Sequence, residues 1–246
     1  MSSTPIVLIT GAAGGIGRAL VQRLHAAHWR LALVSREAAR LDDLPAALRM
    51  VADAADPAAA ERIVAQCCEA LGSPTHFVHL VGSTLVAPLH RVSPEQWRAL
   101  LDTNLGSAFA MLQAWIAARR KDGGGGAAVL TSSVVAQIGV ANHEAIAAAK
   151  GGVEALVRSA AASYASAGLR VNAVAPGLTD TPLTAPMLKL DVQREAAARQ
   201  YPLGGIQQAD DVAAAIAWLL SEQAARITGQ ILPVDGGFTT VRPLVR

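Results

Sequence analysis

The sequence predicts an α/β fold in which one doubly wound, parallel sheet of seven strands lies between two helical layers, a three-layer αβα sandwich. Short apolar runs rich in Val, Ile and Leu alternate with longer segments of helical period. Such continuous apolar runs are typical of parallel strands buried on both faces. The expected strands cover residues 6–10, 31–35, 49–52, 76–81, 127–132, 170–175 and 230–234. The expected helices cover residues 15–27, 37–46, 57–71, 94–120, 142–166 and 209–222.

Length and composition restrict the protein to a globular class. A chain of 246 residues is ordinary for one α/β domain, so we expect a single domain over residues 1–246. Hydrophobic residues make up 52% and charged residues only 16%, which excludes a disordered protein. The net charge is +2 and the basic residues are scattered, so nucleic acid is not expected as a partner.

The sequence indicates a cytoplasmic protein. The N-terminus has no secretory-signal pattern and leads straight into the first strand and a glycine turn. No run of 18 strongly apolar residues predicts a membrane span. Cys67 and Cys68 are adjacent on an expected helix, where a disulfide would be strained and a metal would lack further ligands, so we expect reduced thiols and no metal site.

Two segments interrupt the regular alternation. The glycine run at 123–126 fits a flexible connection into the fifth strand. Residues 178–205 contain three prolines around a helical stretch and are expected to form a lid over the strand ends.

A glycine-rich turn separates the first strand from the first helix. Glycine allows the backbone to approach phosphate oxygens, and the helix N-terminus supplies unpaired N–H groups and a positive dipole end. This context predicts a Rossmann-like site for a dinucleotide pyrophosphate. The expected contacts are Gly11, Ala13, Gly15, Ile16 and Gly17.

The end of the second strand predicts which dinucleotide binds. An acidic residue there would accept the ribose hydroxyls of NAD, but the sequence has Ser35 and Arg36, a pair that suits a 2′-phosphate and favours NADP(H) over NAD(H). Asp53 and Ala54 follow the third strand and are expected beside the adenine. Asp53 has an alternative role as the cap of the helix that begins near Pro57.

These motifs resemble the short-chain dehydrogenase/reductase family over essentially the whole chain. The run 10–17 is similar to its Thr-Gly-x-x-x-Gly-x-Gly signature, 171–177 to its sixth strand and following turn, and 234–237 to its typical ending. Its Asn-Asn-Ala-Gly segment is only partly present, as residues 79–82. The resemblance implies that Gly82, Pro176, Gly177, Thr179 and Thr181 contact the cofactor, the last four around the nicotinamide.

The resemblance also implies a catalytic set of asparagine, serine, tyrosine and lysine. Asn104, Ser133 and Lys150 match three of its members. The tyrosine belongs thirteen residues after the serine and four before the lysine; both spacings give position 146, which is isoleucine. Lys150 is then expected to bind the nicotinamide ribose, Asn104 to hold a water and Ser133 to bind a carbonyl oxygen. Isoleucine cannot donate the proton that the tyrosine supplies.

The replacement donor stays open at this point. His143 lies seven residues before Lys150, where related enoyl reductases carry a tyrosine, but Asn142-His143-Glu144 also fits a helix cap. Tyr201 lies in the expected lid, where it could reach a substrate or only pack. Ser133 or a water are the other candidates. Tyr164 lies too far along its helix and is expected to be structural.

Three functions remain. The leading one is an atypical NADP(H)-dependent oxidoreductase acting on a small or acyl-linked carbonyl or enoyl substrate. The others are a catalytically silent NADP(H)-binding partner subunit, and an isomerase or dehydratase that retains the cofactor. Arg119 and Arg120 fit either a solvated helix end or a contact with an acyl carrier. The apolar, alanine-rich helices at 94–120 and 142–166 predict a homodimer or homotetramer.

Overall fold

The computed structural model, which describes residues 4–242, contains the expected parallel sheet. Its strand order is β3-β2-β1-β4-β5-β6-β9, with every neighbouring pair parallel. This order reverses between β1 and β4, which is where open α/β sheets bind ligands at the carboxyl ends of their strands. The strands are β1 (Ile6–Thr10), β2 (Arg30–Ser35), β3 (Leu48–Val51), β4 (His76–His79), β5 (Gly126–Thr131), β6 (Leu169–Pro176) and β9 (Ile231–Val234).

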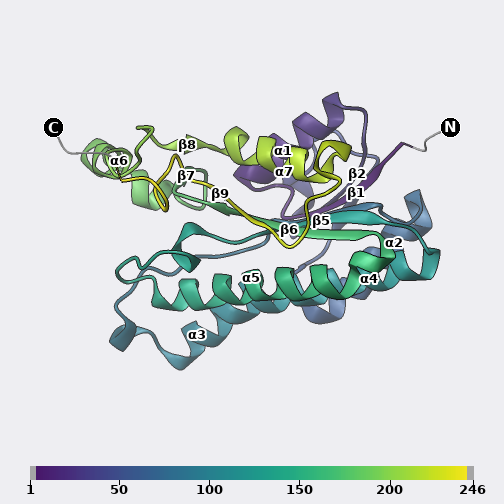
Figure 1. Ribbon diagram of the computed structural model, residues 1–246, viewed down its shortest axis with the longest axis horizontal. Coiled ribbons are helices and arrows are strands. Elements are labelled where there is room, and N and C mark those ends of the chain that lie inside the picture. The colour runs from purple at the N-terminus through teal and green to yellow at the C-terminus, as the bar shows by residue number, and fades with distance from the viewer. Residues whose placement is uncertain (1–3, 243–246) are drawn as a thin grey trace.

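Two helical layers cover the sheet (Figure 1). One face carries α1 (Gly15–Ala26) and α7 (Ala209–Leu220); the other carries α2 (Pro57–Leu71), α4 (Ser107–Asp122) and α5 (Glu144–Tyr164). Side chains of alternate strand residues enter opposite cores: Leu8 packs with α2, α4 and α5, whereas Val7 and Ile9 pack with α1 and α7. This alternation explains why the strands have continuous apolar sequences.

The prediction of a helix at 37–46 is wrong. Only a 3-10 turn forms there, η1 (Ala38–Arg40), although Leu41 and Leu44 are buried. The Arg49 guanidinium donates to the carbonyl oxygens of both leucines, and Pro45 has no N–H with which to continue a helix.

The long helix expected at 94–120 has an interruption that becomes important at the candidate site. It comprises α3 (Pro94–Leu101), a π-helical turn at Asp102–Gly106, and then α4. The capping box of Ser93 and Gln96 starts the helix. A single π turn inside an α-helix shifts the side chains that follow, and such turns are frequent at functional sites.

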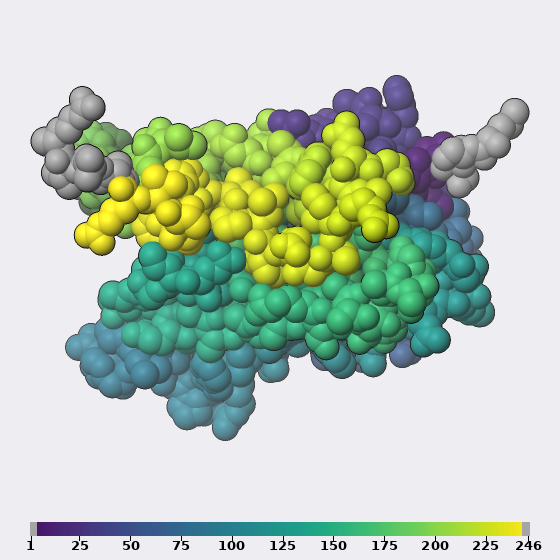
Figure 2. Space-filling view, viewed as in Figure 1, coloured from purple at the N-terminus to yellow at the C-terminus, as the bar shows by residue number. Residues whose placement is uncertain are grey.

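The segment 178–205 lies at the carboxyl end of the sheet, because it continues directly from β6. It contains β7 (Thr179–Asp180), a 3-10 turn (Ala185–Leu188) and α6 (Asp191–Ala198), and β7 pairs with β8 (Gln207–Gln208) just beyond it. Figure 1 places these elements together beyond one end of the sheet, away from the N-terminus. In Figure 2 the C-terminal segment, in yellow, runs across the visible face between the two helical layers.

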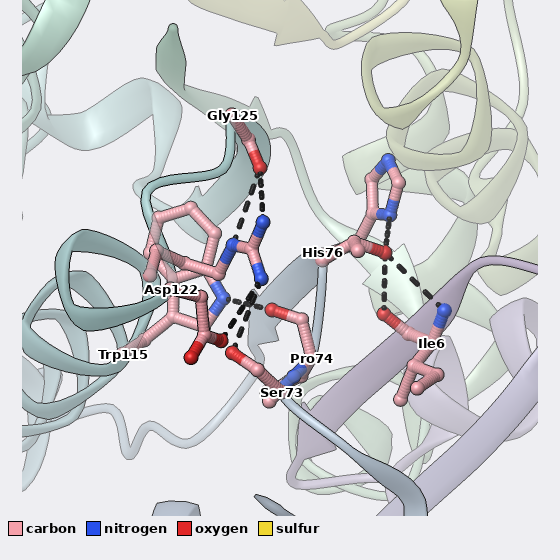
Figure 3. A network of polar contacts seen from close by, with 9 residues as sticks. Ile6, Ser73, Pro74, His76, Trp115, Asp122 and Gly125 are labelled. Carbon is pink, nitrogen blue, oxygen red and sulfur yellow. Dashed lines mark hydrogen bonds and ion pairs between the residues drawn. The ribbon is translucent and has the colours of Figure 1, made fainter. Parts of the chain in front are cut away.

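At the opposite end of the sheet, where the central strands β4 and β5 begin, Arg119 forms a network of polar contacts (Figure 3). This arginine is 7% exposed, donates to the Gly125 carbonyl at 2.7 Å and to Ser73 at 3.1 Å, and pairs with Asp122. The Trp115 indole donates to the Pro74 carbonyl, just before β4. The expectation of a solvated Arg119 is therefore wrong, because its guanidinium caps the backbone that enters β5.

No helix among the described residues is long and apolar enough to cross a membrane. Across residues 4–242 no group of His, Cys, Asp and Glu could hold a metal ion. Cys67 and Cys68 are both free thiols, and burial raises the pKa of the Cys67 thiol to about 12.

Candidate active site

A cavity of about 380 Å³ opens at the carboxyl ends of the strands. Its wall comes from Ile16 in the first turn of α1, the loop after β4, the π turn, the end of β5 and the start of α5. The turn after β6, the 178–205 segment and Phe238 complete it. Its volume lies within the range of ligand sites, and most of its wall is apolar. The expected residues that line it are Ile16, Gly82, Asn104, Ser133, Lys150, Pro176, Gly177, Thr179 and Thr181.

Asn104 is held rigidly at one side of this cavity. It lies in the π turn, is 1% exposed, and donates from Nδ2 to the Leu100 carbonyl at 2.9 Å and to the Ser83 hydroxyl at 3.2 Å. A Cβ on Gly82 would come within 2.9 Å of Asn104 Oδ1 and 3.4 Å of Lys150 Nζ. Only glycine therefore leaves room where these two polar side chains converge.

Lys150 and Ser133 face the cavity from α5 and from the end of β5. The Lys150 ammonium donates to the Thr131 carbonyl at 2.9 Å, and burial lowers the pKa of this lysine to about 8. The Ser133 hydroxyl oxygen accepts from the Val135 N–H at 3.4 Å, which leaves its proton available for a ligand. Both side chains are thus in place to hydrogen-bond a molecule bound in the cavity.

Ile146 also lines the cavity, one helical turn before Lys150. It is 4% exposed and packs with Leu100 and Ala145 in a small apolar cluster, against which Leu85 also packs. The position that the resemblance gives to the tyrosine is therefore filled by a hydrocarbon side chain that faces the cavity and donates no proton.

Besides Ser133, two of the candidate donors share this cavity, and Tyr164 does not. His143 and Tyr201 line the wall, whereas Tyr164 packs against the core beneath α5, as expected. His143 occupies the N-cap position of α5, but its side chain forms no cap hydrogen bond. Nδ1 of His143 instead donates to the Ala141 carbonyl at 2.7 Å.

The glycine turn fits a dinucleotide phosphate. Gly11 has φ = +74°, and a Cβ there would lie 2.8 Å from the Leu80 carbonyl carbon. A Cβ on Gly17 would lie 2.5 Å from the Gly11 oxygen, so the turn closes tightly against the start of α1. No side chain caps α1 and its first turn carries no acidic residue, which leaves its N–H groups for an anion.

The region expected to bind the adenosine lies outside the cavity, at the ends of β2 and β3. Arg36 is exposed and forms no ion pair with any residue in 4–242, while the Ser35 hydroxyl accepts from the Glu37 N–H. Asp53 is exposed and accepts from the Ala55 N–H. The expected residues outside the cavity wall are Gly11, Ala13, Gly15, Gly17, Ser35, Arg36, Asp53 and Ala54.

The cap of α2 is Asp56, whose carboxylate accepts from the Ala58 N–H. The alternative role of Asp53 as that cap is therefore wrong. A cap lies directly before the first helical turn, and Pro57 is the first residue of α2.

Sequence reasoning missed the role of His79. It is the last residue of β4, pairs in register with Thr10 at the end of β1, and is 2% exposed. Ser107 donates to the Thr103 carbonyl at 2.6 Å, so His79 Nε2–H donates to Ser107 at 2.9 Å and His79 Nδ1 accepts from the Thr10 hydroxyl at 2.8 Å. A neutral imidazole thus ties β1 and β4 to the start of α4 beside the cavity. The only signal in the sequence was the departure from the Asn-Asn-Ala-Gly segment.

Comparison with known proteins agrees with this geometry. A family model described as enoyl-(acyl carrier protein) reductase matches residues 11–239. The cis-4-hydroxycyclohexanecarboxylate dehydrogenase of Sinomonas cyclohexanicum is 38% identical over 245 residues, 96% of this chain and 97% of that protein. The 3-oxoacyl-(acyl-carrier-protein) reductase of Escherichia coli is 34% identical over 241 residues, 96% and 98% of the two chains. Ligand-free aldohexose dehydrogenase of Thermoplasma acidophilum superposes with a TM-score of 0.91 at 28% identity, covering 99% and 97%.

Proposed function

Since the chain belongs to the short-chain dehydrogenase/reductase family of oxidoreductases, we propose that it transfers hydride between NADP(H) and a small or acyl-linked carbonyl or enoyl substrate. The observation that carries this proposal is the convergence of Asn104, Ser133 and Lys150 on one cavity beside the glycine turn. Two relatives are named as a dehydrogenase of a cyclic hydroxy acid and a reductase of 3-oxoacyl groups, which supports a carbonyl as the reacting group.

Each polar side chain has a task in this proposal. Lys150 binds the ribose hydroxyls next to the nicotinamide, and its donation to Thr131 fixes its direction. Ser133 donates a hydrogen bond from its free hydroxyl to the substrate oxygen. Asn104 holds a water against the cavity floor. NADPH, when bound, supplies the hydride. Orientation of the two reactants then accounts for most of the rate that survives at an isoleucine in position 146.

The preference for NADP(H) rests on Arg36. Its guanidinium is exposed at the tip of β2 and free to pair with a 2′-phosphate, and a second guanidinium, Arg40, reaches the glycine turn by donating to the Ala13 carbonyl. Arg36→Ala is expected to weaken NADPH binding about tenfold or more and to leave NADH binding unchanged, because a charge-assisted hydrogen bond is worth about 1.5–3 kcal/mol. Cofactor fluorescence titration measures both affinities.

The matched control for this titration is Arg226→Ala. Arg226 is an exposed arginine before β9, at the edge of the sheet opposite Arg36. A comparable loss of NADPH affinity in both variants, or equal weakening of NADH and NADPH by Arg36→Ala, overturns the assignment of the 2′-phosphate contact.

The reaction itself is tested by NADPH oxidation on a panel of cyclic ketones, acetoacetyl thioesters and enoyl thioesters. Turnover of any class supports the proposal and identifies the substrate type. Tight NADPH binding with no turnover on the whole panel overturns it and leaves a cofactor-binding partner subunit. Product formation without net NADPH consumption would instead reveal an isomerase or a dehydratase.

The proposal includes a second copy of the chain as partner, in a cytoplasmic dimer or tetramer. Phe109 on α4 is 52% exposed beside a shallow groove formed with Leu105 and Leu156. Phe109→Glu is expected to convert the oligomer into a monomer in size-exclusion chromatography with light scattering. A wild-type protein that is already monomeric at micromolar concentration contradicts the self-association.

A further inference from the structure

The cavity holds few groups that can exchange a proton. Among the described residues that line it, three carry titratable side chains: His143, Lys150 and Tyr201. Lys150 is committed to the Thr131 carbonyl and, in the proposed function, to the cofactor ribose. Among these titratable groups, the choice of a proton donor in place of a tyrosine at 146 therefore lies between His143 and Tyr201.

Tyr201 is anchored to the turn after β6, and its burial makes it a weaker acid. Its hydroxyl oxygen accepts from the Leu178 N–H at 2.7 Å, and its ring packs on Phe238 with centroids 5.3 Å apart. Its ring edge is also the closest contact of Gly177, where an added Cβ would lie 2.9 Å from the tyrosine Cε1. Burial raises the pKa of Tyr201, which makes it a weaker acid than a free phenol. These contacts give Tyr201 a structural task in holding the turn after β6.

His143 is the titratable residue best placed to replace the tyrosine hydroxyl that is missing at position 146. His143, Ile146 and Lys150 are three and then four residues apart, so they follow one face of the start of α5, and all three line the cavity. The imidazole thus lies one helical turn from the isoleucine, on the side away from the lysine. The imidazole is half-buried, whereas Lys150 is buried.

The orientation of the imidazole is set by the backbone around it. Asn142 has φ = +63°, a left-handed conformation, and its carbonyl accepts from the Ala87 N–H at 3.0 Å, which fixes this turn to the loop after β4. Since the Ala141 carbonyl can only accept, His143 Nδ1 carries a hydrogen. Nε2 is therefore the ring nitrogen left to exchange a proton with a ligand.

We propose that His143 Nε2 is the proton donor and acceptor of the reaction, in place of the tyrosine absent from position 146. The proposal rests on the proposed function. In reduction, the carbonyl carbon gains hydride, its π-electron pair moves to oxygen, and that oxygen takes the proton from Nε2 of the imidazolium. The N–H electron pair stays on Nε2, and water reprotonates the ring. In oxidation, neutral Nε2 removes the hydroxyl proton by the reverse path.

The test is a double-mutant cycle of His143→Ala and Ile146→Tyr. The measured quantity is the rate of hydride transfer in a single turnover, monitored by the fluorescence of NADPH. His143→Ala alone is expected to slow the step about 10²–10⁴-fold, the usual worth of a general acid. In the Ile146→Tyr background, where tyrosine can again donate, His143→Ala is expected to change the rate less than about threefold. A purely structural role would give the same loss in both backgrounds, and this would overturn the proposal.

Two variants separate chemistry from folding. His143→Gln keeps a polar side chain at the start of α5, so an intact rate in this variant would overturn the proposal. His90→Ala removes an exposed histidine outside the cavity and is expected to change nothing. NADPH affinity measured by fluorescence is expected to stay within about threefold in every variant.

A second measurement does not depend on turnover. Nitrogen NMR of the histidine rings, with His143→Gln for assignment, is expected to show the neutral ring protonated at Nδ1 and bare at Nε2. Protonation at Nε2 in the neutral ring would overturn the proposal. A wild-type protein that binds NADPH but has no activity overturns the proposed oxidoreductase and the role of His143 together. An active protein insensitive to His143→Ala overturns only the role of His143.

Discussion

Acid is expected to destabilise the protein through His79. This imidazole is 2% exposed and bridges Thr10 to Ser107 in its neutral form. Burial, and to a lesser degree the charge of Lys150, lowers the pKa of His79 from its ordinary 6.5 to about 3. Between these values the unfolded chain binds a proton that the folded protein does not, so stability falls as the pH drops below about 6.5.

The size of this effect at pH 5 follows from the ordinary pKa alone. A pH of 5 lies 1.5 units below the ordinary pKa of 6.5, so the imidazole of the unfolded chain is protonated while that of the folded protein remains neutral. At 1.36 kcal/mol per unit, the free energy of unfolding falls by about 2 kcal/mol. His76, whose pKa burial lowers to about 4, acts in the same direction. Urea unfolding at pH 8, 7, 6 and 5 measures the free energy of unfolding across this window.

The decisive comparison is His79→Asn against His90→Asn. His79→Asn is expected to reduce the loss of stability between pH 8 and pH 5 by about 2 kcal/mol, whatever its stability at pH 8. His90 is exposed, so His90→Asn is expected to leave the pH dependence unchanged. An unchanged pH dependence in His79→Asn would show that this imidazole is not held neutral between the strands.

The remaining predictions concern the glycine turn, α5 and the arginine network. Gly17→Ala is expected to abolish NADPH binding in a fluorescence titration, because its Cβ would lie 2.5 Å from the Gly11 oxygen; intact binding would contradict the turn geometry. Gly151→Ala, with no atom within 4 Å of the added Cβ, is expected to raise the free energy of unfolding by about 0.5–1 kcal/mol in urea and to keep NADPH binding. Arg119→Met is expected to lower that free energy by about 2–3 kcal/mol, since it removes the charge-assisted hydrogen bonds of the guanidinium to the Gly125 carbonyl and to Ser73. Arg120→Met, at an exposed site, changes it by less than about 0.5 kcal/mol; equal effects would refute the network.

Local sequence pattern was sufficient for the sheet and most helices. The seven strands appear within about two residues of their expected limits, because most of them are buried on both faces and have short continuous apolar runs. The segment 37–46 failed for the opposite reason. Its alanines and leucines have helical spacing, but the side chain of Arg49 takes the carbonyls that a helix would need. Such competition is invisible to periodicity.

The π turn is a second feature beyond the reach of pattern. The segment 94–120 has helical sequence throughout, and nothing in it indicates one wider turn at Asp102–Gly106. Yet this turn places Asn104 where its amide reaches Ser83 and Leu100. The candidate role of Asn104 could be read from resemblance, but the reason that it faces the cavity lies in the backbone.

The sequence by itself determined the fold class, the glycine turn and the presence of isoleucine at position 146, because these depend on residue identity and short spacings. Only the tertiary structure decided which protic side chains share the cavity. Tyr201 and His143 lie on segments almost sixty residues apart, and His79 joins three elements through one neutral ring. Periodicity reports which face of an element is buried; the packing of distant elements decides what that face meets.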